Sequence, residues 1–132
     1  MNSSHTYSYD ASQGLIFLPG EIVGPLRSEA ISFVFDPGAF RTMVSTELTD
    51  YLGYHASGTS QKISADSVIG REHGCTLRLK KLTILGFDFS EIDVACFDLP
   101  EGVDALLGLD VLRHFEITLR HADHWISFAP IN

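Results

Sequence analysis

The chain has 132 residues, 45% of them hydrophobic, which is enough to bury the core of one domain. Nine basic residues against seventeen acidic ones give a formal net charge of −8, and this argues against a nucleic-acid partner, because phosphates require a basic surface. No apolar run is long enough to span a membrane, and no basic start leads into a stretch of signal-peptide type, so we expect no membrane partner and a cytoplasmic protein.

The first part of the chain, residues 1–13, is polar and shows no apolar periodicity. Such a stretch is typical of a frayed end, and we expect it to form a polar N-terminal extension of a single domain that covers residues 14–132. A short strand is predicted at residues 15–18, where Pro19-Gly20 breaks the β-prone pattern.

The most informative stretch covers residues 31–39. A β-prone, almost wholly apolar run ends in one carboxylate, Asp36, and Pro37-Gly38 then turns the backbone. Burying a carboxylate is costly unless it is hydrogen-bonded or shares a proton. Two interpretations follow from this stretch alone. Asp36 either caps an Asx-type turn at the end of a strand, or it is held there for chemistry.

The residues after this turn have the pattern of a strand followed by a short helix. Residues 42–45 are β-prone, and Thr46 has the side chain of a helix cap. Glu47 in the first turn suits the helix dipole, and Gly53 can end the helix in a left-handed conformation. We therefore expect a helix over residues 47–52 that braces the loop ahead of it.

A hairpin is predicted at residues 63–69, where two short β-prone pieces flank Ala65, Asp66 and Ser67. The tip is expected at Asp66-Ser67, although these residues fit the positive φ of a two-residue turn less well than Asn-Gly does. Taken alone, this pattern indicates an ordinary surface hairpin.

The remaining elements are also β-prone. Apolar and polar residues alternate between residues 75 and 97, with a turn at Gly86. Residues 115–119 and 125–128 have the pattern of a hairpin. Many short strands and little helix indicate an all-β domain with one or two short helices.

Few residues have the pattern of a metal or redox site. Cys75 and Cys96 lack a metal-type spacing, and reduced, buried thiols are expected rather than a disulfide. His121 and His124 have no third ligand beside them in the sequence, and a turn does not aim both rings inward. We therefore expect no metal and no cofactor.

A second key stretch covers residues 102–112. A short apolar strand is closed by Gly108, and the residues after it have the pattern of a helical turn. Together with the stretch at residues 31–39, it resembles the retroviral-type (retropepsin-like) single-lobe aspartic proteases. The resemblance runs from about Leu15 to Phe128, in the order and spacing of the family.

The family's motifs map onto particular residues here. A strand that ends in Asp-Thr/Ser-Gly-Ala is matched by an active-site loop in which the catalytic residue is Asp36, followed by Pro37, Gly38 and Ala39. The later apolar-apolar-Gly segment, which packs beside that loop in the family, is matched by Leu106, Leu107 and Gly108. The hairpin with Ala65, Asp66 and Ser67 takes the position of the flap, which closes over the substrate.

The resemblance implies a small closed β-barrel and a homodimeric endopeptidase that acts on a peptide or protein substrate. Each of two chains would contribute one Asp36, because this chain holds a single Asp-x-Gly motif. The departure from the family is Pro37, which lacks both the hydroxyl of Thr or Ser and a backbone N–H. A catalytically silent protease-fold module that binds a peptide or dimerises is the alternative, and an unrelated β-barrel that holds an apolar ligand is a third interpretation.

Overall fold

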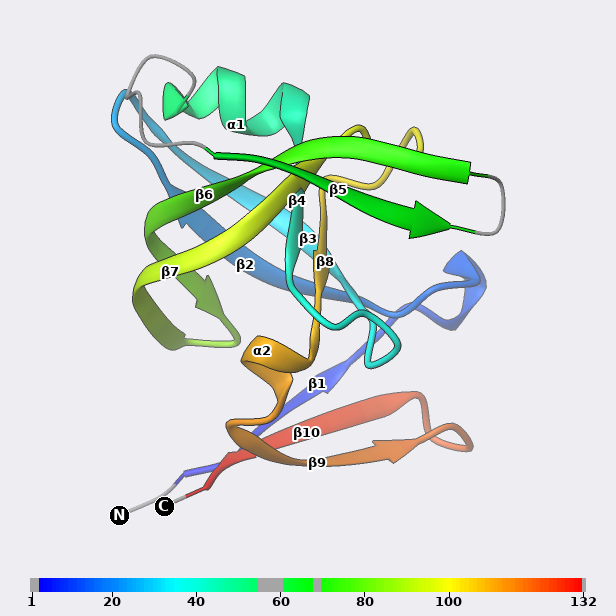
Figure 1. Ribbon diagram of the computed structural model, residues 1–132. Coiled ribbons are helices and arrows are strands. Elements are labelled where there is room, and N and C mark those ends of the chain that lie inside the picture. Colours follow the sequence, from blue (N-terminus) through cyan, green and yellow to red (C-terminus); the bar gives the residue numbers. More distant parts are fainter. Residues whose placement is uncertain (1–2, 55–60, 68–69, 132) are drawn as a thin grey trace.

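Figure 1 shows the computed structural model, which describes residues 3–54, 61–67 and 70–131. The strands are β1 (His5–Ser8), β2 (Phe17–Val23), β3 (Ser28–Phe35), β4 (Met43–Ser45), β5 (Gln61–Ser67), β6 (Gly70–Ile84), β7 (Phe87–Phe97), β8 (Ala105–Leu107), β9 (Phe115–Arg120) and β10 (Trp125–Pro130). The helices are the 3-10 helix η1 (Ala11–Gln13) and the α-helices α1 (Thr46–Leu52) and α2 (Leu109–Leu112). None of the helices in this part of the chain is long and apolar enough to cross a membrane.

Six of the strands close into a barrel, as predicted. They follow the order β2-β3-β8-β4-β7-β6, and β6 pairs back onto β2 from Gly20 opposite Ile84 to Val23 opposite Lys81. β5 pairs with β6 outside this ring, so the β5–β6 hairpin extends away from the barrel (Figure 1). The all-β fold with a small closed barrel and two short α-helices is therefore confirmed.

The core lies inside the barrel and is built from alternate residues of its strands. Each such side chain contributes roughly 1.5–3 kcal/mol when it is fully removed from water. The large side chains with almost no exposed surface include Leu18, Ile22, Phe33, Val44, Leu77, Leu79, Leu82, Ile84 and Leu107.

A second, three-stranded sheet in the order β1-β10-β9 joins the two ends of the chain. It packs on the barrel through aromatic rings. The Phe115 ring centroid lies 5.1 Å from that of Phe128 and 4.9 Å from that of Phe87, near the turn between β6 and β7. The rings are tilted against each other, an arrangement that aromatic pairs favour over a parallel sandwich.

The prediction of a frayed N-terminal end is wrong for residues 5–13. His5–Ser8 form β1, which pairs with β10 from His5 opposite Phe128 to Ser8 opposite Trp125. Asp10 then caps η1, since Ser12 N donates to Asp10 Oδ1 over 3.0 Å. The pairing supplies backbone partners that the local sequence does not reveal, because β1 buries little side-chain surface and so lacks an apolar period.

The predicted strand break at Pro19-Gly20 is also wrong, because β2 runs through both residues. Phe35 N donates to Ile16 O. Counting from Ile16, every second residue therefore turns its backbone N–H and C=O groups toward β3, whereas the backbone groups of Pro19 point away from β3. Pairing of β2 with β6 begins only at Gly20. On that side the Pro19 carbonyl accepts from Leu85 N over 3.4 Å, so the missing N–H lies at the end of the ladder, a position that tolerates proline.

Helix α1 begins one residue earlier than predicted. Its cap is Ser45 instead of Thr46, because Leu48 N donates to Ser45 Oγ over 3.1 Å. Gly53 ends the helix with φ at 98° in the left-handed conformation, as predicted.

Cys75 and Cys96 lie opposite each other on β6 and β7, and both thiols are free. Burial, which disfavours the thiolate, raises the pKa of Cys96 to about 12, and the neighbouring Cys75 acts in the same direction. Cys96 is therefore a neutral thiol at physiological pH.

Gly20 lies where the barrel closes, and β6 approaches β2 too closely there to leave room for a side chain. A Cβ at residue 20 would lie 2.3 Å from Thr83 O and 2.5 Å from the Phe33 ring. We expect Gly20→Ala to lower the free energy of unfolding by about 2–3 kcal/mol, because β2 and β6 must separate. Urea unfolding measures the change.

Gly102→Ala is the matched control for this substitution. Gly102 has φ at 85°, and a Cβ there would meet no atom within 4 Å, so the cost is that of the left-handed backbone alone, about 1 kcal/mol. Equal losses for the two variants would show that the close approach of β2 and β6 at Gly20 does not limit stability.

Candidate active site

Asp36 lies directly after β3, half-buried, at the first position of a tight turn. Ala39 N donates to Asp36 O over 3.0 Å and closes the turn. Pro37 occupies its second position, for which the fixed φ of proline is suited. The turn predicted from Pro37-Gly38 is therefore confirmed.

The Asp36 carboxylate is oriented by the turn that follows it. Gly38 N donates to Asp36 Oδ1 over 3.1 Å, and a Cβ at residue 38 would lie 3.3 Å from the same oxygen. This is the Asx-type bond expected of a capping carboxylate, and it is also the Gly38 contact that the family resemblance implies. The bond fixes Oδ1 on the turn and is compatible with both interpretations of Asp36.

β8 is the strand that contacts the Asp36 turn and helps to position it. It runs parallel to the end of β3, with Val34 opposite Leu106. Asp36 N donates to Leu107 O over 3.1 Å, and Leu109 N donates to Ala39 O over 2.9 Å. Leu106, Leu107 and Gly108 therefore lie beside the Asp36 turn.

Gly108 is required where α2 meets the end of the same loop. A Cβ at residue 108 would lie 2.5 Å from Arg41 C and 2.7 Å from Arg41 O. A side chain at this position would push α2 away from the loop that carries Asp36.

Thr42 and Asp110 form a lock that the sequence analysis missed. Thr42 is fully buried, and its N–H donates to both Asp110 oxygens over 2.9 and 3.0 Å. The Thr42 hydroxyl donates to Asp110 Oδ1 over 2.7 Å and accepts from Gly108 N over 3.1 Å. The sequence signal for this lock was an acidic residue in the first turn of a helix that begins directly after a glycine.

The predicted flap residues lie on the hairpin that leaves the barrel. Ala65, Asp66 and Ser67 belong to β5 and pair with Glu72, Arg71 and Gly70. The predicted tip at Asp66-Ser67 is therefore wrong, because β5 continues through both residues and pairs there with β6. The hairpin itself is confirmed.

The outer half of this hairpin is held by two strands alone. β6 pairs with β7 from Cys75 onward, so the segment from Gly70 to Gly74 has β5 as its one partner among the described strands. Isolated two-stranded ribbons are marginally stable, so this segment is held less firmly than the strands of the barrel.

The two histidines near the C-terminal turn do not form part of a metal centre in the described structure. His124 packs edge-on against Tyr9, with ring centroids 6.0 Å apart. Across residues 3–54, 61–67 and 70–131 no group of three or more metal-ligating side chains is present.

We expect Asp110→Ala to loosen the Asp36 loop, because the buried N–H and hydroxyl of Thr42 lose their acceptor. The free energy of unfolding should fall by about 3 kcal/mol, and amide hydrogen exchange at residues 36–42 should accelerate. Asp110→Asn keeps one acceptor oxygen and should lose about a third of that amount. If both variants match the wild type in unfolding and exchange, the Thr42–Asp110 contact does not hold the loop.

Comparison with known proteins gives the same picture as the geometry. The sequence profile of the aspartyl protease family matches residues 18–111. A crystal structure of a retropepsin-like aspartic protease from Rickettsia conorii is similar at a TM-score of 0.72 and 18% identity, covering 98% of this chain and 92% of that one. The retroviral protease-like domain of Ddi1 from Leishmania major is similar at a TM-score of 0.61 and 14% identity, covering 88% of this chain and 92% of that one.

No curated protein sequence matches the chain. The family profile nevertheless spans the Asp36 turn, the β5–β6 hairpin and β8, which is more than half of the residues. The chain therefore belongs to the aspartyl protease family and has the retropepsin-like fold.

Proposed function

We propose that the protein is a homodimeric aspartic endopeptidase in which each copy contributes Asp36. The observation that carries this proposal is the turn that presents Asp36 at the end of β3, with Gly38 N bonded to its carboxylate over 3.1 Å. The family of the chain and its fold support the same assignment.

Two copies are required because the chemistry needs two carboxylates. Peptide hydrolysis by this route uses a pair about 3 Å apart that shares one proton, since like charges at that distance do not both ionise. The chain holds one Asp-x-Gly motif. A two-fold axis beside the Asp36 turn brings the second carboxylate from an identical surface on the partner.

In the proposed mechanism the two Asp36 side chains act as acid and base. One carboxylate takes a proton from the attacking water while the protonated partner polarises the scissile carbonyl. The Gly38 N–H holds each carboxylate at its place in the pair.

Exposed apolar side chains beside the turn support association at this end of the molecule. Phe40 follows the turn and is 75% exposed, and Leu109, whose N–H is bonded to Ala39 O, is 40% exposed. Exposed apolar side chains that lie close together are typical of an interface, and we propose that the second copy covers Phe40 and Leu109.

We also propose that the β5–β6 hairpin acts as the flap, with Ala65, Asp66 and Ser67 over an extended peptide substrate. In the outer half of the hairpin, β5 and β6 pair with each other and with no other described strand. Such an arm can close on a bound peptide without disturbing the barrel.

Pro37 favours a second candidate function, a protease-fold module that binds a peptide or dimerises without cleavage. In the family, a hydroxyl at this position bonds to the partner loop's backbone N–H, and the bonds are reciprocal. Proline offers neither group, so the dimer loses about 2 kcal/mol, at roughly 1 kcal/mol for each hydrogen bond. The carboxylates would then be held less closely to reacting geometry.

We expect Asp36→Asn to abolish proteolysis and to leave folding intact or more stable, because the like-charge repulsion of the dyad is removed. Cleavage of an unfolded protein library at acidic and neutral pH measures activity, and light scattering at micromolar concentration measures the dimer. Asp98→Asn, an exposed carboxylate away from the turn, is the control and should cleave as wild type does.

Two results would contradict the endopeptidase. A protein that stays monomeric at high concentration, with or without peptide, lacks the dyad. Cleavage by Asp36→Asn at the wild-type rate would come from other residues or from a contaminant.

Pro37→Thr should restore both reciprocal bonds. We expect the dimer to tighten by one to two powers of ten, since about 1.4 kcal/mol is tenfold, and the cleavage rate to rise because the carboxylates are held closer to reacting geometry. Analytical ultracentrifugation and the same cleavage assay measure the two effects.

The outcome of this substitution separates the two candidate functions. A tighter dimer that still does not cleave indicates the silent module. A dimer that is unchanged or weaker shows that the Asp36 turns do not meet at the two-fold axis, and Asp36 is then a turn-capping carboxylate.

A further inference from the structure

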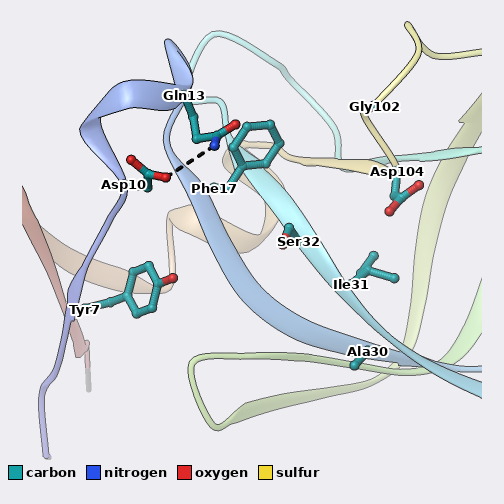
Figure 2. A pocket seen from close by; sticks show the side chains of 9 residues that line it. All are labelled: Tyr7, Asp10, Gln13, Phe17, Ala30, Ile31, Ser32, Gly102 and Asp104. Carbon is teal, nitrogen blue, oxygen red and sulfur yellow. Dashed lines mark hydrogen bonds between the residues drawn. The ribbon is translucent and has the colours of Figure 1, made fainter.

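Two adjoining cavities follow the first half of β3, away from the Asp36 turn. The first has a volume of about 660 Å³ and the second about 390 Å³, and both are lined by Ala30, Ile31 and Asp104. Figure 2 shows the first cavity, with Tyr7, Asp10 and Gln13 on one side and Gly102 and Asp104 on the other. The second continues toward Leu48 and Tyr51 of α1. We call these two adjoining cavities together the β3 groove.

The floor of the β3 groove contains a free strand edge. β8 covers β3 only from Phe33 onward, so the segment before it has β2 as its one partner among the described strands. Backbone groups along β3 point alternately toward β2 and away from it. Because Phe35 N donates to Ile16 O, the residues that turn their N–H and C=O groups toward β2 are Phe33, Ile31 and Glu29.

Ala30 and Ser32 consequently point backbone groups toward the groove. Both residues are exposed. The N–H and C=O of Ala30 and the N–H of Ser32 have no strand opposite them in the described chain. A row of such groups is a template on which a further strand can pair.

The charge of the groove selects the kind of strand that fits. Asp10, Glu29, Glu47 and Asp104 line its two cavities, whereas no Lys or Arg does. None of these carboxylates takes part in a salt bridge within the described residues. Between them lie the apolar surfaces of Phe17, Ile31 and Leu48.

We propose that the β3 groove binds an extended peptide segment in which Lys or Arg alternates with apolar residues. The segment adds to the free edge of β3 through Ala30 and Ser32, and its cationic side chains lie against Glu29 and Asp104. Alternation suits an extended strand, because successive side chains point to opposite faces.

This site goes beyond the proposed endopeptidase and does not depend on it. Ala30 and Asp36 are separated by about 20 Å along the strand, at roughly 3.3 Å per residue, and Asp36 does not line either cavity. Binding at the β3 groove is therefore measurable in a protein that cannot cleave.

The test uses the full chain carrying Asp36→Asn and a fluorescent, end-blocked octapeptide of alternating lysine and valine. We expect saturable binding by fluorescence anisotropy that weakens as salt is raised, because the contacts are ionic and exposed. NMR should show amide shifts at Ser28–Ser32. The same peptide with glutamate in place of lysine should not bind.

Two variants test the edge and the charge separately. Ala30→Pro removes the outward N–H without breaking the β2 ladder and should weaken binding at least tenfold. Glu29→Gln with Asp104→Asn should weaken it about fivefold, within the range of exposed ion pairs. Glu116→Gln, an exposed carboxylate on β9, is the matched control and should bind as the parent does.

If Ala30→Pro does not fold, the peptide methylated on alternate backbone nitrogens replaces it, and weaker binding of that peptide supports strand addition. Binding that survives both the edge change and the paired charge change overturns the proposal. Amide shifts confined to the Asp36 turn or the β5–β6 hairpin, with none at Ser28–Ser32, overturn it as well.

Discussion

The hydrogen bond from Asp36 N to Leu107 O, 3.1 Å long, joins two segments that are far apart in the chain. It exists because β8 lies parallel to the end of β3 within the barrel. Gly108 then lets α2 approach the loop, and the Thr42–Asp110 lock fixes the loop's far end. The position of the Asp36 carboxylate thus depends on backbone contacts and on the Thr42–Asp110 pair.

The barrel makes this arrangement rigid. Phe33 and Val34 are buried just before Asp36, so the carboxylate emerges where the strand leaves the core. The second half of β3 lies between β2 on one side and β8 on the other. The first half of the same strand has a free edge. One strand therefore serves two regions, an Asp36 turn held by β8 and a groove that is open to a partner.

The sequence predicted the elements that carry a local signal. The apolar run before Asp36, the glycine cap at Gly53 and the alternation around Gly86 all depend on neighbouring residues, and the structure has the strand, helix and turn expected there. What depends on distant partners was missed. β1 exists only because β10 lies beside it, Pro19 is tolerated because β6 ends at Ile84, opposite Gly20, and Asp110 meets Thr42 only in the folded barrel. The turn at Asp36 was predicted from Pro37-Gly38 and is present, while the β3 groove has no signature in the chain.

The pairing of β1 with β10 places His5 opposite Phe128, so that the first and last strands of the described chain lie side by side (Figure 1). Contacts between residues so distant in sequence slow folding, because a long loop must close before they form. On the ribosome, β1 cannot pair with β10 until β10 has left the exit tunnel. The barrel strands are all made earlier, so among the described strands those of the sheet β1-β10-β9 are the last that synthesis can bring together.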